Sequence, residues 1–140
     1  MKNLYLQRIG YSGRIENLVS KSLGHYNLGS LVECKIIKMG YEDLNLHVET
    51  SKGDYFMKLF AKQGEYKKTL PQVKEYIKKI NVAIETGVNH PRMYKNRTGD
   101  ILTIVEYYGK KYPLAIFEYL NKPSLSETNE KLTKDDLQEL

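Results

Sequence analysis

The stretch GDYFMKLF, residues 53–60, decides the fold that the sequence predicts. It is one of the most apolar and aromatic segments of the chain, and it is typical of a buried β-strand except for one residue, Lys58. An ammonium group taken out of water costs several kcal/mol unless an anion meets it. Lys58 therefore either lies on the wet face of a sheet or is placed to meet a negative charge.

Two further strands precede the lysine strand, and short turns join the three. The predicted strands are residues 31–40, 44–50 and 55–61. The first is rich in β-branched and apolar residues and ends at Gly40, whereas the second alternates strictly between apolar and polar side chains. Because the turns at 41–43 and 51–54 are short, we expect an antiparallel meander.

The hydrophobic period changes after the third strand. From Leu70 to Ile84 the apolar residues follow the spacing of an amphipathic helix, with Pro71 in its first turn and Gly87 just beyond its end. Two more strands and an N-terminal helix are predicted at residues 101–107, 112–119 and 14–23. This order predicts an α+β fold, a five-stranded antiparallel sheet with one packed helix, plus an N-terminal helix.

Length and composition are typical of one domain. The chain has 140 residues, 41% of them hydrophobic, and no apolar run long enough to predict a membrane span or a secretory signal. Cys34 is the only cysteine, which excludes an internal disulfide and favours a reducing, cytoplasmic location. With 22 basic and 17 acidic residues, the net charge of +5 is too small to indicate nucleic-acid binding.

The order of these elements, with a lysine in the third strand, resembles the N-terminal lobe of a protein-kinase-like fold. Residues 26–61 resemble the start of the aminoglycoside phosphotransferase and choline kinase superfamily, where a second strand and a tight turn lead into a Y-x-x-K-L motif. GVNHPRMY, residues 87–94, is similar to the G-V-x-x-P link of that family, and LAIFEYLNKPSL, residues 114–125, is similar to its hinge. The resemblance covers residues 26–127.

The resemblance implies that Lys58 binds ATP. In kinase-like folds the lysine of the third strand reaches the α- and β-phosphates and is held by a carboxylate of the following helix. Glu75 matches that helix glutamate, and Glu65 is the substitute. The simpler alternatives are a strand lysine whose ammonium reaches solvent, and a Glu75 that faces water and pairs with Lys79.

The same resemblance implies a nucleotide pocket around Lys58. Besides Lys58 and Glu75, its residues are Gly40, Tyr41, Glu42, Asp43, Leu46, Phe56, Phe117, Glu118 and Leu120. The first four form a phosphate loop that uses backbone N–H groups, although one glycine stands where protein kinases have three, and a plain hairpin turn is the alternative. Leu46 and Phe56 lie against the adenine, Phe117 closes the back of the pocket, and the last two offer hinge backbone groups to the base.

The catalytic residues of the family have no match in this sequence. The family carries its general base and magnesium ligands in a loop of the form H-G-D-x-x-x-x-N and a following aspartate. That loop is not found, and no two histidines have metal-ligand spacing, so we assign no catalytic or metal-binding residue. We expect a helical extension at 1–29, a nucleotide-binding lobe at 30–120, and a hinge with the start of a missing second lobe at 121–140.

The function that the resemblance implies is ATP binding within a small-molecule phosphotransferase. Such an enzyme transfers the γ-phosphate of ATP to a hydroxyl group with Mg²⁺, and the missing lobe supplies the magnesium ligands and the acceptor site. Aminoglycoside, choline, homoserine, a methylthio-sugar and a peptide hydroxyl stay open as acceptors. The alternative is a non-catalytic module that contacts a partner through the cleft face. We expect the isolated lobe to be inactive, and its exposed apolar face to favour self-association.

Overall fold

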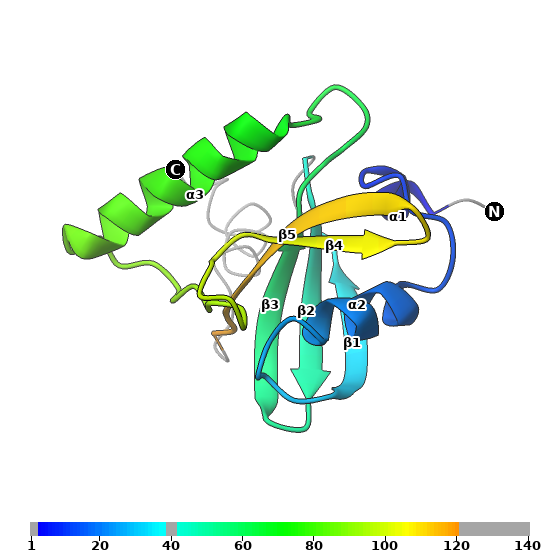
Figure 1. Ribbon diagram of the computed structural model, residues 1–140, viewed down its shortest axis with the longest axis horizontal. Coiled ribbons are helices and arrows are strands. Elements are labelled where there is room, and N and C mark those ends of the chain that lie inside the picture. Colours follow the sequence, from blue (N-terminus) through cyan, green and yellow to red (C-terminus); the bar gives the residue numbers. More distant parts are fainter. Residues whose placement is uncertain (1–2, 39–41, 121–140) are drawn as a thin grey trace, which may run out of the picture.

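The computed structural model describes residues 3–38 and 42–120, which form an α+β fold (Figure 1). Its elements in chain order are α1 (Leu4–Gln7), α2 (Ile15–Leu23), β1 (Leu31–Ile37), β2 (Leu44–Thr50), β3 (Gly53–Leu59), α3 (Leu70–Glu85), β4 (Thr103–Tyr107) and β5 (Lys110–Glu118). The predicted fold class is therefore confirmed. Among the described helices, only α1, a single turn, is not predicted from the sequence. No helix in the described part of the chain is long and apolar enough to cross a bilayer.

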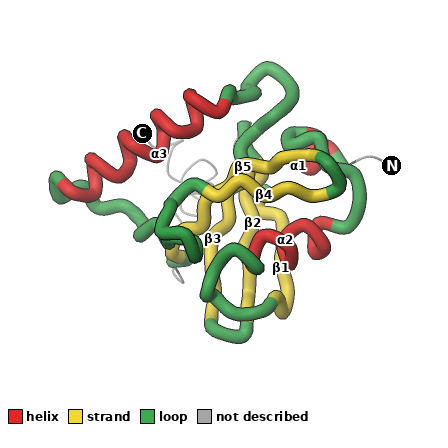
Figure 2. Tube along the Cα trace, viewed as in Figure 1, coloured by secondary structure: helices red, strands yellow, loops and turns green. Residues whose placement is uncertain are grey.

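The five strands form one antiparallel sheet in the order β1-β2-β3-β5-β4, and Figure 2 shows them in yellow as one twisted layer. Strand β3 is central, since it pairs with β2 on one side and with β5 on the other. In this register Lys58 lies opposite Asn45 of β2 and Ala115 of β5. The lysine therefore lies in the interior of the sheet.

The sheet packs on both faces because successive side chains of a strand point to opposite sides. On one face, Met57 of β3 belongs to a buried core that includes Leu18 and Val19 of α2. On the other face, Phe117 of β5 belongs to a second core that includes Val73 and Ile77 of α3. The side chain of Lys58 shares this second face, since its neighbour Met57 points to the first.

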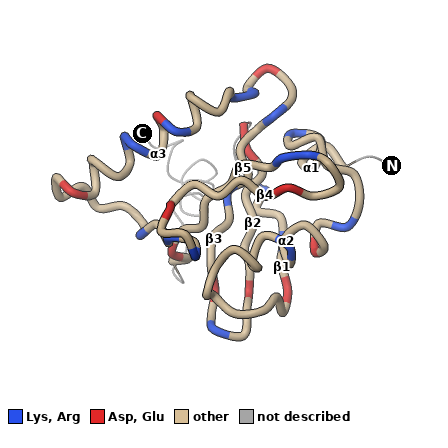
Figure 3. The backbone as a smooth tube through the Cα atoms, viewed as in Figure 1, with Lys and Arg blue, Asp and Glu red and all other residues tan. Residues whose placement is uncertain are grey.

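Helix α3 begins with a capping box. The side chain of Thr69 accepts a hydrogen bond from the N–H of Gln72, while the side chain of Gln72 accepts one from the N–H of Thr69. The buried residues Val73 and Ile77 face the sheet. Exposed lysines occupy the outer side of the helix, and Figure 3 shows basic and acidic positions interspersed along the chain.

Candidate functional site

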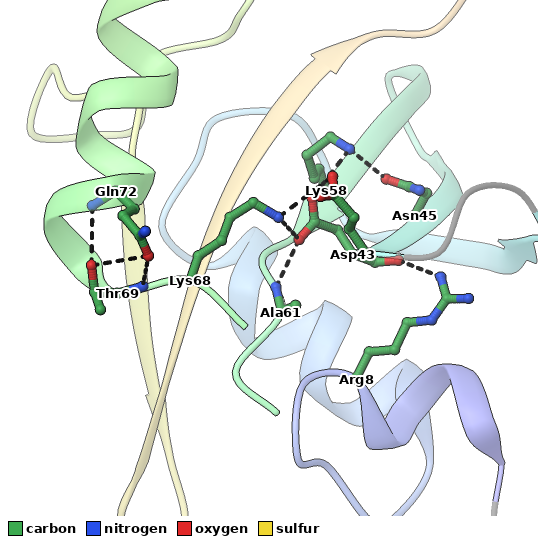
Figure 4. Close-up of polar contacts among 9 residues, drawn as sticks. Arg8, Asp43, Asn45, Lys58, Ala61, Lys68, Thr69 and Gln72 are labelled. Atoms are coloured by element: carbon green, nitrogen blue, oxygen red, sulfur yellow. Dashed lines mark hydrogen bonds and ion pairs between the residues drawn. The ribbon is translucent and has the colours of Figure 1, made fainter. Parts of the chain in front are cut away.

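The ammonium of Lys58 meets a negative charge from within the chain (Figure 4). Its Nζ donates a hydrogen bond to Oδ1 of Asn45 at 3.0 Å and lies 3.6 Å from Oδ2 of Asp43. The side chain is only 18% exposed. Burial lowers the pKa of Lys58 below its ordinary value, and the charge of Asp43 opposes that shift. Lys58 is therefore a largely buried, paired lysine rather than one on the wet face.

Asp43 is the centre of this polar cluster, and its side chain is 6% exposed. Its Oδ1 accepts a hydrogen bond from the backbone N–H of Ala61 at 2.8 Å and one from Nζ of Lys68 at 3.0 Å. Its backbone carbonyl accepts a hydrogen bond from the guanidinium of Arg8 at 2.9 Å. Asp43 is thus held by contacts from three separate segments of the chain.

Lys68 is the second lysine on this carboxylate, and it is not among the residues that the sequence predicts for the site. It lies in the connection between β3 and α3, directly before the N-cap residue Thr69, and its side chain is 18% exposed. Its Nζ also lies 3.8 Å from Oε2 of Glu42. The signal available in the sequence was weak, because Lys67 and Lys68 form an ordinary basic pair before a helix.

The predicted partner of Lys58 was wrong. Glu75 is exposed on α3, and Lys58 pairs with Asp43 in the structure. Glu75 lies two positions from both Val73 and Ile77, which face the sheet, and two residues turn a helix by about 200°. Its side chain therefore points away from the sheet. The substitute Glu65 is exposed as well.

The position predicted for Leu46 was also wrong. Leu46 lies opposite Met57 in the β2–β3 ladder, and residues directly opposite each other share a face. It is fully buried in the core beneath α2, on the other side of the sheet from Lys58. The residue of β2 opposite Phe56 is His47, whose ring stacks on Tyr119 with centroids 3.9 Å apart and an interplanar angle of 4°.

The aromatic residues predicted for the pocket lie on the face that Lys58 shares. The rings of Phe56 and Phe117 meet edge to face, with centroids 6.0 Å apart, and Nζ of Lys58 lies 5.9 Å from the centroid of Phe56. Phe117 is buried and Phe56 is half-buried. The structure therefore brings the lysine and both phenyl rings together on one side of the sheet.

The predicted hinge residues lie at the end of β5: Glu118 is the last residue of the strand, and Leu120 follows two positions later. The N–H of Glu118 donates a hydrogen bond to the carbonyl of Arg92 at 2.7 Å, which ties the hinge to the link before β4. Leu120 is 51% exposed. In the predicted phosphate loop, Gly40 and Tyr41 lie outside the described residues. Within the described part of that loop, Asp43 offers its carboxylate to Lys58.

Comparisons with known proteins support the fold. No family model matches the sequence, and no curated protein matches it either. Among solved structures, the fold of the chain is similar to the structure of the microcompartment-associated aminopropanol kinase, with a TM-score of 0.62 and 13% sequence identity. The match covers 79% of this chain and 33% of that kinase, so the chain spans about a third of the length of its structural neighbour. A likeness at this identity shows a kinase-like fold.

Proposed function

We propose that the chain is the ATP-binding lobe of a phosphotransferase that acts on a hydroxyl group of a small molecule. One observation carries the proposal. In a kinase-like sheet, the central strand β3 holds Lys58 beside a buried carboxylate and on the same face as Phe56. The structural neighbour is a small-molecule kinase by its description, which supports this class of reaction.

Lys58 suits the phosphates because its ammonium is already oriented. Asn45 and Asp43 hold two sides of the group, and an ammonium has three N–H donors. Charge–charge interactions are stronger in a partly dehydrated site than in water, so a fixed ammonium stabilises a phosphate without rearranging first. When bound, ATP supplies the phosphoryl group that is transferred. The role of Lys58 is to position the phosphates and to neutralise part of their charge.

Phe56 and Phe117 suit the base because they form an apolar patch beside the lysine. The exposed part of Phe56 offers a ring face or edge to a purine, and Phe117 supports it from behind. Glu118 and Leu120 follow directly at the end of β5, where their backbone groups are proposed to meet the adenine. His47 and Tyr119 add a second aromatic pair, which is stacked, at this end of the sheet.

The proposed reaction uses magnesium, whose ligands we do not assign to the described part of the chain. Residues 3–38 and 42–120 contain no group of three His, Cys, Asp or Glu side chains that could hold a metal ion. Asp43, a buried carboxylate, is committed to two lysines and a backbone N–H. We therefore propose that the second lobe supplies the metal ligands and the acceptor pocket, and we derive no step through the metal.

A non-catalytic interaction module is the second candidate, and one observation favours it. Lys58 and Lys68 both contact Asp43, and Lys68 also lies 3.8 Å from Oε2 of Glu42, so the cluster is held together without a nucleotide. A structural cluster of this kind ties the β1–β2 connection to the start of α3. The two candidates differ in whether an adenine nucleotide binds on the face of Lys58.

The test is a titration of the chain with ATP and with adenosine, in which two-dimensional NMR spectra are recorded at each step. We expect ATP to shift the resonances of Lys58, Phe56 and Phe117 with a dissociation constant of about 1 mM, since in this proposal the second lobe forms the other wall of the site. Lys58→Met should weaken ATP binding and leave adenosine binding unchanged. Lys74→Met, an exposed change of equal charge on α3, is the control. No shift at these residues with either compound would overturn the proposal and favour the interaction module.

A further inference from the structure

Two ammonium groups converge on one buried carboxylate in this fold. Lys68 binds Oδ1 of Asp43 at 3.0 Å, and Lys58 lies 3.6 Å from Oδ2. Burial is the main cause of the lowered pKa of Lys58, and the charge of Lys68 lowers it further, which places the two cations within electrostatic reach of each other. Asp43 neutralises only one of them. The remaining carboxylate, on Glu42, is 56% exposed, so solvent screens its contribution.

The backbone of Ala61 holds this arrangement in place. Its N–H donates to Asp43 at 2.8 Å, and its carbonyl accepts a hydrogen bond from the N–H of Lys68 at 2.9 Å. The residue that anchors the carboxylate therefore also anchors the second lysine. Ala61 follows the end of β3, so the position of Lys68 relative to Lys58 is set by the sheet and not by the outer part of α3.

The N-terminus of α3 has several backbone N–H groups already engaged within the chain. Thr69 and Gln72 cap one another, and the N–H of Val73 donates to the carbonyl of Thr69. Pro71 has no N–H to offer. The two lysine side chains offer charged donors to an anion at this corner of the fold.

We infer that Lys68 is a second phosphate-binding residue, which together with Lys58 makes the site selective for nucleoside di- and triphosphates over monophosphates. The inference rests on the proposed nucleotide site. Ordering and partly burying a lysine side chain costs rotamer entropy, and Lys58 alone balances the charge of Asp43. A polyphosphate chain carries several charges along its length, so two cations that share one carboxylate match it better than they match a single phosphate.

The experiment compares four probes on the chain by NMR titration: adenosine, AMP, ATP and inorganic tripolyphosphate. Lys68→Met should weaken ATP and tripolyphosphate binding by roughly tenfold, because it removes one charged hydrogen bond, and leave adenosine unchanged. Lys68→Arg keeps the charge and should retain binding within about threefold. Lys67→Met is the matched control, since Lys67 is the adjacent residue of equal charge and its side chain is exposed.

A direct measurement on the unaltered chain accompanies the variants. The side-chain CεH₂ resonances of Lys68 should shift when tripolyphosphate is added, and those of Lys67 should not. This readout holds even where Lys68→Met does not fold, which a thermal melt reveals.

The outcomes separate this inference from the proposed function. If Lys58→Met weakens ATP binding while Lys68→Met behaves like Lys67→Met, the role of Lys68 is overturned and the nucleotide site stands. If tripolyphosphate binds as tightly as ATP and adenosine does not bind, the proposed adenine nucleotide function fails while the lysine pair stands. Equal binding of AMP and ATP overturns the stated selectivity, and no binding of any probe overturns both.

Discussion

The carboxylate that meets the ammonium of Lys58, at 3.6 Å, belongs to Asp43 and comes from the connection before β2. Asp43 directly precedes β2, which pairs with β3 along its whole length, so this pairing brings Asp43 close to Lys58. The ion pair does not depend on the position of α3. In this chain the strand lysine is oriented by the sheet itself.

Asp43→Ala should lower the free energy of unfolding by roughly 2–4 kcal/mol, because it leaves two lysines and the N–H of Ala61 without their shared partner. Asp43→Asn keeps an oxygen acceptor for the N–H of Ala61, so this variant should lose less free energy of unfolding than Asp43→Ala. Urea unfolding measures both values. Glu42→Ala, which removes an exposed carboxylate, is the control and should change stability by no more than about 0.5 kcal/mol. Equal losses for Asp43→Ala and Glu42→Ala would show that the cluster contributes little.

Glu75→Gln should leave both ATP affinity and stability unchanged, since its side chain is exposed and Lys58 has another partner. Asp43→Asn should weaken ATP binding in the same assay, because the lysine loses the group that orients it. A nucleotide titration of the two variants compares the two carboxylates directly. If Glu75→Gln weakened ATP binding more than Asp43→Asn, the helix glutamate would be the functional partner after all.

Stability should fall between pH 10 and 12 because of Tyr26. Burial raises the pKa of Tyr26 from its ordinary 10.0 to about 12, and its hydroxyl forms a 2.6 Å hydrogen bond with Thr103. The folded pKa lies above the unfolded one, so this contribution is fully present below pH 10 and is lost as the pH rises through the folded value. A shift of this size corresponds to roughly 2–3 kcal/mol.

Urea unfolding across this pH range measures the effect, with Tyr26→Phe as the test variant. Its stability should depend less steeply on pH, whereas Tyr108→Phe, which alters a ring that is 89% exposed, should keep the slope of the unaltered chain. Identical slopes for all three proteins would contradict the prediction. Thr103 keeps one partner in the test variant, because Asn96 also donates to its hydroxyl.

Cys34 should react slowly with alkylating reagents in the folded chain. Burial, together with the nearby Glu16 and Glu33, raises the pKa of its thiol from 9.0 to about 11. Because the thiolate is the reactive form, a shift of this size lowers its population about 100-fold near neutral pH. Iodoacetamide labelling followed by mass spectrometry measures the rate, and unfolding in urea should restore the rate of a free cysteine. Equal rates in the folded and unfolded states would contradict the predicted shift.

The strands and helices of the fold follow from local patterns. The strict alternation over 44–50, the apolar run over 55–61 and the amphipathic period over 70–84 each depend on neighbours in the chain, and the structure places β2, β3 and α3 within two residues of these ranges. The boundaries of β4 and β5 differ from prediction by one or two residues. The helix α1 was not predicted because a single turn is too short to show a period.

The sequence by itself determined that one lysine lies in a buried central strand, and that such a lysine needs a negative charge nearby. Only the tertiary structure decided which charge that is. Asp43, Lys58 and Lys68 are separated by many residues and meet only after the hairpin of β2 and β3 closes and the chain turns toward α3. The face of Leu46 was decided in the same way, because strand register sets which side chains lie opposite each other, and a shift of one residue exchanges the two faces.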